Sequence, residues 1–489
     1  MTNWMAALAA HHAQMRRAYP QDELLIIFDI DGTILDLRHM IFYLLTRYDR
    51  EHGTDHFRNL SLTDIDVHEN VIDRFLLRLG LPDMARAEIE RWYLERYWSP
   101  EIIATAHYAF ENVFAVIRWL QIQPQTTVAL NTGREERMRG DTLAALNRMG
   151  EQYGVHFANE LLYMRPDEWV DGVAARKVMG IAHVRAMGYR VIAFIDNEPA
   201  NLAAIAASLG AEEILLLHAD TIFLSPLEML PPTALKGDRY SLLDLITEAQ
   251  LPPTIDLVWH GVNDPINLRQ FLSSPVAWAE LDVNLELASA ALILRHDTLD
   301  ERPAAPGEQW LTLETALCRC AQWQKKVKLD FKVAGAPIEQ SLALIDQYGF
   351  SAEQLWFNGE VRILDEVWAQ QLAERYPGAV IQAPIGFLRK WIDQPATLQS
   401  EVERLAGWGL NRFSLNWNHT ETRRMTKRLM EWGYEVNLYG IPDLDAFLQA
   451  LLLLPRAITC DFNFPTWGYY GRGSGQHGHF IEYTYTHSA

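Results

Sequence analysis

Two aspartates two residues apart are the residues of this chain whose types and spacing point most directly to chemistry. Asp29 and Asp31 follow the apolar run 24–28, and Gly32 comes directly after them. In an extended chain, side chains at i and i+2 leave the same face, and a glycine lets the backbone turn sharply away. Two like charges this close require a cation. A carboxylate nucleophile beside an acid/base carboxylate and Mg²⁺ is suited to phosphoryl transfer through an aspartyl-phosphate; the alternative is a strand with an Asp-Gly turn.

The length and composition predict a globular protein of two domains. A chain of 489 residues is long for one core, and 49% hydrophobic and 22% charged residues give no indication of disorder. The net charge of −20 argues against an extended nucleic-acid interface or an anionic membrane surface. The cysteines Cys318, Cys320 and Cys460 are too few for a disulfide framework and favour a reducing compartment. We predict a cytoplasmic protein without a signal peptide or a transmembrane segment.

The region before residue 253 alternates between strands and helices, which predicts a parallel α/β sheet. Apolar strands are expected at 24–28, 127–130, 191–195 and 213–217, with a helix at 135–149. A long helical stretch interrupts this alternation, with amphipathic segments at 39–51, 67–79 and 84–97. We predict that residues 36–125 form a helical cap above the carboxyl edge of the sheet.

A second α/β domain is expected from residue 253 to 489, after a proline-rich boundary near residues 250–255. Short strands are expected at 257–259, 278–283, 292–295, 327–331, 354–357, 380–382, 413–416, 436–439 and 458–462. Helices separate most of them, so we predict a (β/α)₈ TIM-type barrel. The set is one strand larger than such a barrel needs, and we expect the extra strand to be a hairpin arm or an N-terminal plug. The tail 469–479 is read as a solvated terminus, or alternatively as a loop that covers the substrate.

Three further elements of the first domain fall where phosphoryl transfer requires them. Thr132 and Gly133 follow the second strand and offer a hydroxyl and backbone amides to a phosphate oxygen. Lys177, on a predicted helix, can neutralise the charge of the reacting phosphoryl group. Asp196 ends a later strand and completes a metal site.

Taken together, these motifs resemble the haloacid dehalogenase superfamily over residues 20 to 250. The resemblance implies that Asp29 is the nucleophile and Asp31 the general acid/base, whose main-chain carbonyl also meets Mg²⁺. It further implies that Thr132 binds phosphate, that Lys177 is the charge partner and that Asp196 is a metal ligand. The presence of Asp31 favours phosphatase over dehalogenase chemistry.

The fourth motif departs from this family at the position where many relatives carry a second aspartate. The supporting carboxylate is then Glu198, or it is replaced by Asn201. The cap is expected to select a small phosphorylated metabolite by closing over the site.

The second domain places polar residues at the ends of four predicted strands, the rim where barrel enzymes keep catalytic groups. His260 ends the first strand, Glu280 and Asp282 the second, His296 the third, and Asp330 with Lys332 the fourth. Paired carboxylates with a third from a nearby strand make an oxygen site for Mg²⁺ or Ca²⁺. Two flanking histidines suit cleavage of a phosphodiester.

This arrangement resembles the PLC-like phosphodiesterase superfamily over residues 255 to 489, in particular glycerophosphodiester phosphodiesterases and the menorin-type branch; the Asp-x-Lys pair is also similar to sphingomyelinase D enzymes. The resemblance implies that His260 and His296 form the catalytic pair and that Lys332 contacts phosphate. The implied metal ligands are Glu280, Asp282 and Asp330.

The barrel motifs also depart from the glycerophosphodiesterase pattern. The chain has His260-Gly261-Val262 in place of His-Arg-Gly, and Pro265-Ile266-Asn267 in place of Pro-Glu-Asn. One metal ligand and one phosphate-binding arginine are therefore missing, unless Asn263, Asp330 or Lys332 takes their place. The main hypothesis is a bifunctional hydrolase that cuts a phosphodiester and then a phosphomonoester. A phosphatase with a ligand-binding barrel is the alternative, and the repair of nucleic-acid ends is a weaker one.

Overall fold

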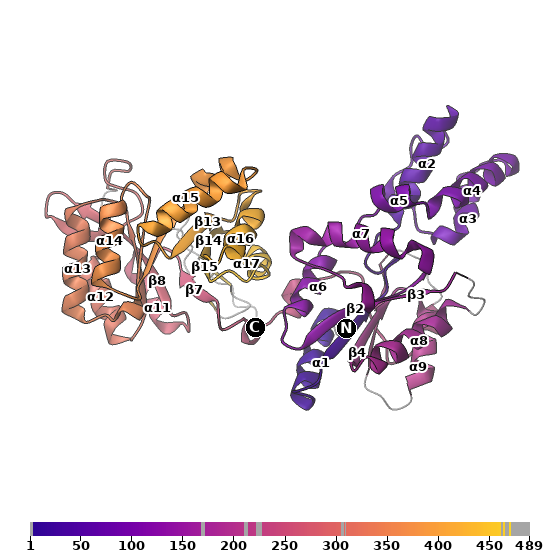
Figure 1. The fold of residues 1–489 in the computed structure, drawn as a ribbon, viewed down its shortest axis with the longest axis horizontal. Coiled ribbons are helices and arrows are strands. Elements are labelled where there is room, and N and C mark those ends of the chain that lie inside the picture. Colours follow the sequence, from indigo (N-terminus) through magenta and orange to yellow (C-terminus); the bar gives the residue numbers. More distant parts are fainter. Residues whose placement is uncertain are drawn as a thin grey trace. The chain divides into compact units, whose positions relative to one another are not determined.

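The computed structural model describes residues 3–167, 172–209, 214–221, 227–304, 308, 310–460, 463–464 and 469–470 (Figure 1). The chain divides into two compact units, Met1–Ile246 and Thr247–Ala489. No helix in these described ranges is long and apolar enough to cross a membrane. Most of the tail 469–479 lies outside the described residues. Within it, β17 (Tyr469–Tyr470) pairs with β16 (Asn463–Phe464) as an antiparallel hairpin.

Six strands in the described part of the first unit form a parallel sheet in the order β3-β2-β1-β4-β5-β6. Their bounds are β1 Leu24–Phe28, β2 Thr126–Glu135, β3 Leu162–Arg165, β4 Arg190–Asp196, β5 Leu215–Ala219 and β6 Leu235–Gly237. The accompanying helices are α1 Trp4–Ala18, α6 Val113–Gln121, α7 Arg139–Gly150, α8 Val173–Ala186, α9 Pro199–Leu209 and α10 Leu242–Leu245. The predicted α/β sheet is confirmed, while β3 and β6 escaped sequence prediction because both are short.

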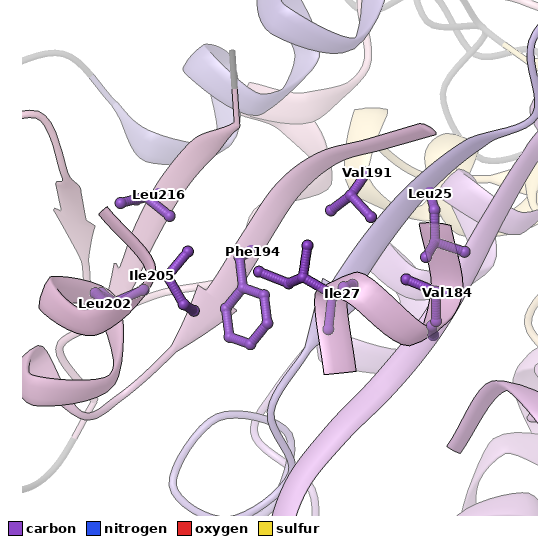
Figure 2. Packing of buried hydrophobic residues seen from close by; sticks show 10 residues of the cluster. Leu25, Ile27, Val184, Val191, Phe194, Leu202, Ile205 and Leu216 are labelled. Carbon is purple, nitrogen blue, oxygen red and sulfur yellow. The ribbon is translucent and has the colours of Figure 1, made fainter. Parts of the chain in front are cut away.

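One hydrophobic core cluster of the first unit is formed by residues of the sheet together with residues of α8 and α9. Leu25, Ile27 and Phe194 point from β1 and β4 toward Val184 and Ile205 on these two helices, and all five are buried (Figure 2). Strands buried on both faces read as unbroken apolar runs, which is why β1 and β4 were recognisable in the sequence. This packing holds the carboxyl ends of β1 and β4 beside one another.

The cap follows β1 and consists of α2 Arg38–His52, α3 Ile72–Arg78, α4 Asp83–Tyr97 and α5 Pro100–Thr105, with the short 3₁₀ helix η2 Glu69–Val71 before α3. These helices stand apart from the sheet in Figure 1. The chain enters and leaves the cap through paired segments, since the Asp36 N–H donates to the Tyr108 carbonyl at 2.8 Å. The helix α6 falls inside the predicted cap range 36–125 but packs against β2 of the sheet.

In the second unit, eight of the described strands close into a parallel barrel, because β8 pairs with both β7 and β10. The barrel strands are β7 Asp256–Trp259, β8 Trp278–Glu286, β10 Lys326–Phe331, β11 Leu355–Gly359, β12 Val380–Pro384, β13 Arg412–Asn416, β14 Glu435–Ile441 and β15 Ala457–Cys460. The surplus strand, β9 Ala291–Leu294, pairs antiparallel with the end of β8. The predicted barrel and its extra hairpin arm are both confirmed.

Helices surround the barrel strands, as the labels in the ribbon show (Figure 1). They are α11 Pro265–Ser273, α12 Leu313–Gln322, α13 Ala336–Tyr348, α14 Glu366–Arg375, α15 Pro395–Gly407, α16 Thr422–Glu431 and α17 Leu444–Leu451. Residues at alternate positions of each strand face the interior of a parallel barrel. This alternation positions the polar residues of β8 and β10 described below.

Candidate active sites

The first candidate site lies at the carboxyl edge of the N-terminal sheet, where β1 and β4 end. Asp29 directly follows the buried strand β1 and is itself 6% exposed, and Asp196 is the fully buried last residue of β4. Gly32, with a φ of 76°, has the left-handed conformation that glycine adopts without strain. The chain can therefore turn toward the cap immediately after Asp31.

Lys177 on α8 joins the two strand-end aspartates. Its Nζ lies 2.5 Å from Asp29 Oδ1 and 2.9 Å from Asp196 Oδ2, and it donates to the Asn131 carbonyl at 2.6 Å. Burial alone would lower the pKa of Lys177, but the two aspartates outweigh burial and raise the pKa above its ordinary value. The structure thus brings Lys177 to the predicted nucleophile as a buried cation.

The charges around Asp29 fit a divalent cation. Burial, with the charges of Asp196 and Asp31, raises the pKa of Asp29 to about 7 against the opposing effect of Lys177. A set of oxygen donors with excess negative charge suits a hard ion such as Mg²⁺. No group of three or more described His, Cys, Asp or Glu side chains has the arrangement of a metal site. The proposed ligands are instead the side chains of Asp29 and Asp196 with the main-chain carbonyl of Asp31.

The side chain of Asp31 is held by Arg134. Arg134 Nη2 donates to Asp31 Oδ1 at 2.6 Å and Nε donates to Oδ2 at 2.8 Å. Burial alone would raise the pKa of Asp31, but the guanidinium outweighs it and lowers the pKa below its ordinary value. Asp31 is therefore ionised in this arrangement, as a general base must be. Arg134 belongs to the motif that follows the second predicted strand, but its pairing with Asp31 was not predicted from the residues.

Thr132 and Gly133 lie inside β2, rather than after the strand as predicted. Thr132 is 1% exposed and its Oγ1 accepts from the Arg134 N–H at 3.2 Å. A Cβ on Gly133 would come within 3.1 Å of the Val173 side chain. Both predicted phosphate-binding residues line the same pocket as Asp29 and Lys177.

The fourth motif positions Asp196 through an amide. Asn201 Nδ2 donates to both oxygens of Asp196, at 3.0 and 3.2 Å, whereas Glu198 contacts it through its main-chain N–H at 2.8 Å. Of the two predicted supports, Asn201 is therefore the one whose side chain holds Asp196. The Glu198 side chain lines the pocket, and burial, followed by the charge of Asp196, raises its pKa to about 7.

The cap supplies side chains that sequence reasoning did not single out. His68, Glu69 and Trp98 line a pocket of about 530 Å³ together with Asp29, Asp31, Thr132 and Lys177. His107 lies 3.1 Å from Arg134 Nη2, and the Trp98 ring lies 4.9 Å from the Arg134 guanidinium carbon. A histidine followed by a glutamate in a helical stretch is too common to mark a site. These cap residues could be recognised only from the structure, which places them around the same pocket as Asp29 and Lys177.

The second candidate site lies inside the barrel, near the end of β10 and within β8, where Glu280 and Asp282 lie inside the strand and not at its end as predicted. In the parallel register, Glu280 pairs with Lys328 and Asp282 with Asp330. These residues are two apart on each strand, so all four share the face that points into the barrel. The structure thus brings together the three predicted metal ligands, Glu280, Asp282 and Asp330.

Two lysines neutralise these carboxylates. Lys332 Nζ lies 2.9 Å from Asp282 Oδ1 and 2.6 Å from Asp330 Oδ2, and Lys328 Nζ lies 2.7 Å from Glu280 Oε1. Burial alone would lower the pKa of Lys332, but Asp282 and Asp330 raise it well above its ordinary range. Lys332 is therefore a fixed cation among the predicted ligands; its contact with phosphate stays a prediction.

Both predicted histidines lie near Asp282. Burial alone would raise the pKa of Asp282, but Lys332, His296 and His260 together hold it well below its usual range. His260 Nε2 is 3.6 Å from Glu280 Oε2. His296 Nδ1 is 2.8 Å from the carboxylate of its neighbour Asp297, a contact that orients its ring.

The prediction that His296 ends a barrel strand is wrong. His296 follows β9, the hairpin arm, which runs antiparallel to β8 and so returns toward the barrel rim. The N–H of Arg295 then donates to the Asp282 carbonyl at 2.9 Å. The histidine thus reaches the site because β8 extends beyond the barrel and folds back on itself.

The barrel carboxylates also fit a divalent cation. Among the described residues, Glu280 Oε2 is a buried oxygen that accepts no hydrogen bond, with His260 Nε2 at 3.6 Å, whereas Asp282 Oδ1 is paired with Lys332 Nζ at 2.9 Å. Buried oxygens without donors are rare in folded proteins, and Mg²⁺ or Ca²⁺ would satisfy them. Glu280, Asp282 and Asp330 are the proposed ligands, although these three side chains do not have the arrangement of a metal site in this structure.

Comparisons with known proteins find structural matches of two kinds. No protein-family model and no curated protein matches the chain. A glycerophosphodiester phosphodiesterase from Parabacteroides distasonis is 15% identical, with a TM-score of 0.32, and is matched over 42% of this chain and 92% of its own. A putative phosphatase from Clostridium difficile is 16% identical, with a TM-score of 0.32, over 46% and 100% of the two chains.

A third match is a HAD-superfamily hydrolase of subfamily IA from Geobacter sulfurreducens. It is 14% identical, with a TM-score of 0.28, over 44% of this chain and 91% of its own. The likeness is one of fold. The two kinds of matched structure are the two that the sequence motifs resemble.

Proposed function

We propose that the chain is a bifunctional metal-dependent phosphohydrolase. The first unit would hydrolyse phosphomonoesters through an aspartyl-phosphate, and the barrel would cleave phosphodiesters. The observation that carries the proposal is the position of Lys177 Nζ, 2.5 Å from Asp29 and 2.9 Å from Asp196, in a pocket that Thr132 also lines. A nucleophile, a buried cation and a hydroxyl donor around one cavity match the requirements of phosphoryl transfer.

In this scheme the carboxylate of Asp29 attacks phosphorus, and Lys177 and Thr132 stabilise the charge on the phosphoryl oxygens. Asp31 would enter the first step in its minor, protonated form and give that proton to the departing alkoxide; the resulting carboxylate would then take a proton from the water that hydrolyses the aspartyl-phosphate, which restores the acid form. Mg²⁺ held by Asp29, Asp196 and the Asp31 carbonyl would neutralise further negative charge on the phosphoryl group. The pairing of Asp31 with Arg134 favours the base form that the second step requires.

In the barrel, His260 and His296 would act as acid and base on a phosphodiester. Asp297 accepts a hydrogen bond from His296 Nδ1, so the Nε2 atom is the nitrogen directed to the reaction. The product of diester cleavage is a phosphomonoester, which is the substrate class proposed for the first unit. The phosphomonoester that the barrel releases would therefore be the substrate of the first unit.

A barrel that only binds its ligand is the second candidate function. Lys332 lies between Asp282 and Asp330, where a fixed ammonium competes with a divalent ion. In that case the first unit alone would turn over substrate. The repair of nucleic-acid ends is disfavoured by the net charge of −20, which argues against an extended nucleic-acid interface.

The test is phosphate release with Mg²⁺ from a panel of phosphomonoesters and phosphodiesters, using the intact chain, Asp29→Asn and His260→Ala. We expect Asp29→Asn to lose monoester turnover by at least about 10³-fold, because the proposed nucleophile is removed. We expect His260→Ala to lose diester cleavage only. Matched controls are the exposed residues Asp55→Asn and His419→Ala.

The coupled scheme makes a further demand on the same assay. One diester must yield free phosphate with the intact chain but stop at the monoester with Asp29→Asn. Strong Asp29-dependent monoesterase activity without diester cleavage in any form would make the barrel a binding module. Monoesterase activity that survives Asp29→Asn would contradict the proposed nucleophile.

A further inference from the structure

The wall of the barrel opposite the proposed metal ligands carries polar side chains that the proposed reaction does not use. β14 is the fourth strand from β10 in either direction around the closed barrel, so these two strands face each other across its interior. Asn437 on β14 is buried inside the barrel, where its Oδ1 accepts from Thr459 Oγ1 on β15 at 3.1 Å. Tyr439, two residues later, leaves the same face of β14 and therefore points inward, nearer the carboxyl ends of the strands.

The charges around Tyr439 link this wall to the carboxylates on the other side. Burial raises the pKa of Tyr439, and the charge of Asp330 adds to this effect, whereas the charge of Arg389 opposes it. The hydroxyl of Tyr439 therefore keeps its proton near neutral pH, within electrostatic range of both Asp330 and Arg389. This hydroxyl makes no hydrogen bond with the residues that the structure describes, so its proton is available to a ligand.

Arg389 brings a guanidinium to the same wall. It belongs to the 3₁₀ helix η9 (Gly386–Trp391), which follows the carboxyl end of β12. A Cβ built on Gly386 would lie 3.0 Å from Arg389 Nη1, so the guanidinium folds back over the start of η9, beside the end of β12. Arg389 is half-buried and forms no ion pair within the described part of the chain. A half-buried cation without a counter-charge is unfavourable unless a ligand supplies that charge.

The two lysines inside the barrel, on the opposite wall, are already neutralised. Lys328 Nζ lies 2.7 Å from Glu280 Oε1, and Lys332 Nζ lies within 3 Å of two aspartates. Because three carboxylates face two lysines, this wall repels an anion in the absence of a metal ion. An anion that enters the barrel therefore finds an uncompensated positive charge at Arg389.

We propose that Arg389, together with the Tyr439 hydroxyl, binds the phosphate group of the diester that the barrel takes. The inference rests on the proposed phosphodiester ligand of the barrel, and it moves to Arg389 the phosphate contact that the resemblance implies for Lys332. A guanidinium offers parallel N–H donors that match two phosphate oxygens, and a phenol adds a further donor. A diester held on this wall faces the carboxylates of β8 and β10 across the barrel.

The experiment is a calorimetric titration of the metal-free intact chain with glycerophosphoglycerol, a diester with a single negative charge. Arg389→Gln should weaken binding by about 10-fold or more, because hydrogen bonds to a charged group are lost. Arg389→Lys keeps the charge without the parallel donors and should retain part of the affinity. Tyr439→Phe should weaken binding by about 3-fold or more. The matched controls are Arg404→Gln on the outer helix α15 and Tyr434→Phe, directly before β14.

The outcomes separate binding from folding and from turnover. Because Arg389 forms no ion pair with a described residue, Arg389→Gln should keep the thermal unfolding midpoint of the intact chain while it weakens binding. If Tyr439→Phe does not fold, Arg389→Gln carries the test. No binding by the intact chain, equal affinity in Arg389→Gln, or a loss of affinity in Lys332→Gln alone would overturn the inference. Absence of diester cleavage in every form would instead overturn the proposed reaction of the barrel, while Arg389-dependent binding would still support the assignment.

Discussion

Arg134 holds both carboxylate oxygens of Asp31, with Nη2 2.6 Å from Oδ1 and Nε 2.8 Å from Oδ2. The same guanidinium lies over the ring of Trp98 at the end of a cap helix and within hydrogen-bonding distance of His107. The predicted acid/base is therefore tied to the cap through one buried arginine. The protonation of Asp31 and the position of the cap therefore both depend on Arg134.

Removing Arg134 should shift the pH dependence of the phosphatase. Arg134 lowers the pKa of Asp31, and the base form of Asp31 is lost as the pH falls through that pKa. In Arg134→Gln the pKa rises, so the acidic limb of the kcat profile should move up by roughly one pH unit or more. The measurement is kcat for a phosphomonoester across pH. The exposed rim residue Arg137→Gln should leave the limb in place, and coincident profiles for Arg134→Gln and the intact chain would refute the assignment.

Lys177 should be important for stability as well as for catalysis. Lys177→Met leaves Asp29 and Asp196 buried without their shared counter-charge, which should cost about 3–5 kcal/mol of unfolding free energy. The double variant Lys177→Met with Asp29→Asn should recover much of this loss, because one buried charge disappears. Urea unfolding in the absence of divalent ions measures both. As a control, Lys236→Met at an exposed position should change stability by less than about 0.5 kcal/mol. If the effects of Lys177→Met and Asp29→Asn simply added, the two side chains would not be energetically coupled.

Glu69 should make the stability of the first unit depend on pH. Its folded pKa is raised from 4.5 to about 8, so the folded state holds a proton that the unfolded chain has released. The stability that this proton confers is lost as the pH rises from about 4.5 to about 8. Glu69→Gln has no such loss, so it should match the intact chain near pH 5 and exceed it by about 1–3 kcal/mol near pH 9. Thermal unfolding at both pH values tests this prediction, and the exposed Glu95→Gln serves as the control. If the stability of Glu69→Gln and that of the intact chain changed equally with pH, Glu69 would not hold a buried proton.

Lys332 should weaken the binding of divalent ions to the barrel. Its ammonium lies within 3 Å of Asp282 and Asp330, two of the proposed ligands. Lys332→Gln removes that positive charge and should raise the affinity for Ca²⁺ or Mg²⁺ by about 10-fold or more. Calorimetric titration of the metal-free protein gives the affinity, and Asp282→Asn should abolish the barrel component. Unchanged affinity in Lys332→Gln would place the ion elsewhere.

Asp29 and Asp196 could be predicted because they lie at the ends of strands with buried faces. Such strands read as unbroken apolar runs, so both aspartates could be placed at strand ends without coordinates, whereas Asp282, which was predicted to end its strand, lies in the middle of β8. His296 was misplaced because β9 is just as apolar as a barrel strand, and only its pairing with β8 shows that it is an antiparallel arm. Hydrophobic periodicity does not distinguish a parallel from an antiparallel strand.

The amino-acid sequence by itself determined the α/β class of both units, the strand-end positions of Asp29 and Asp196, and the helix that carries Lys177, because apolar periodicity and strand-end chemistry are local properties. The tertiary structure alone decided which charges meet. Arg134 reaches Asp31, 103 residues earlier in the chain, and Lys177 reaches Asp29 across 148 residues. Glu69 enters the pocket only because the cap folds over the sheet edge. Charge pairing and burial depend on distances in space, and those distances are set by how the cap and the strands pack.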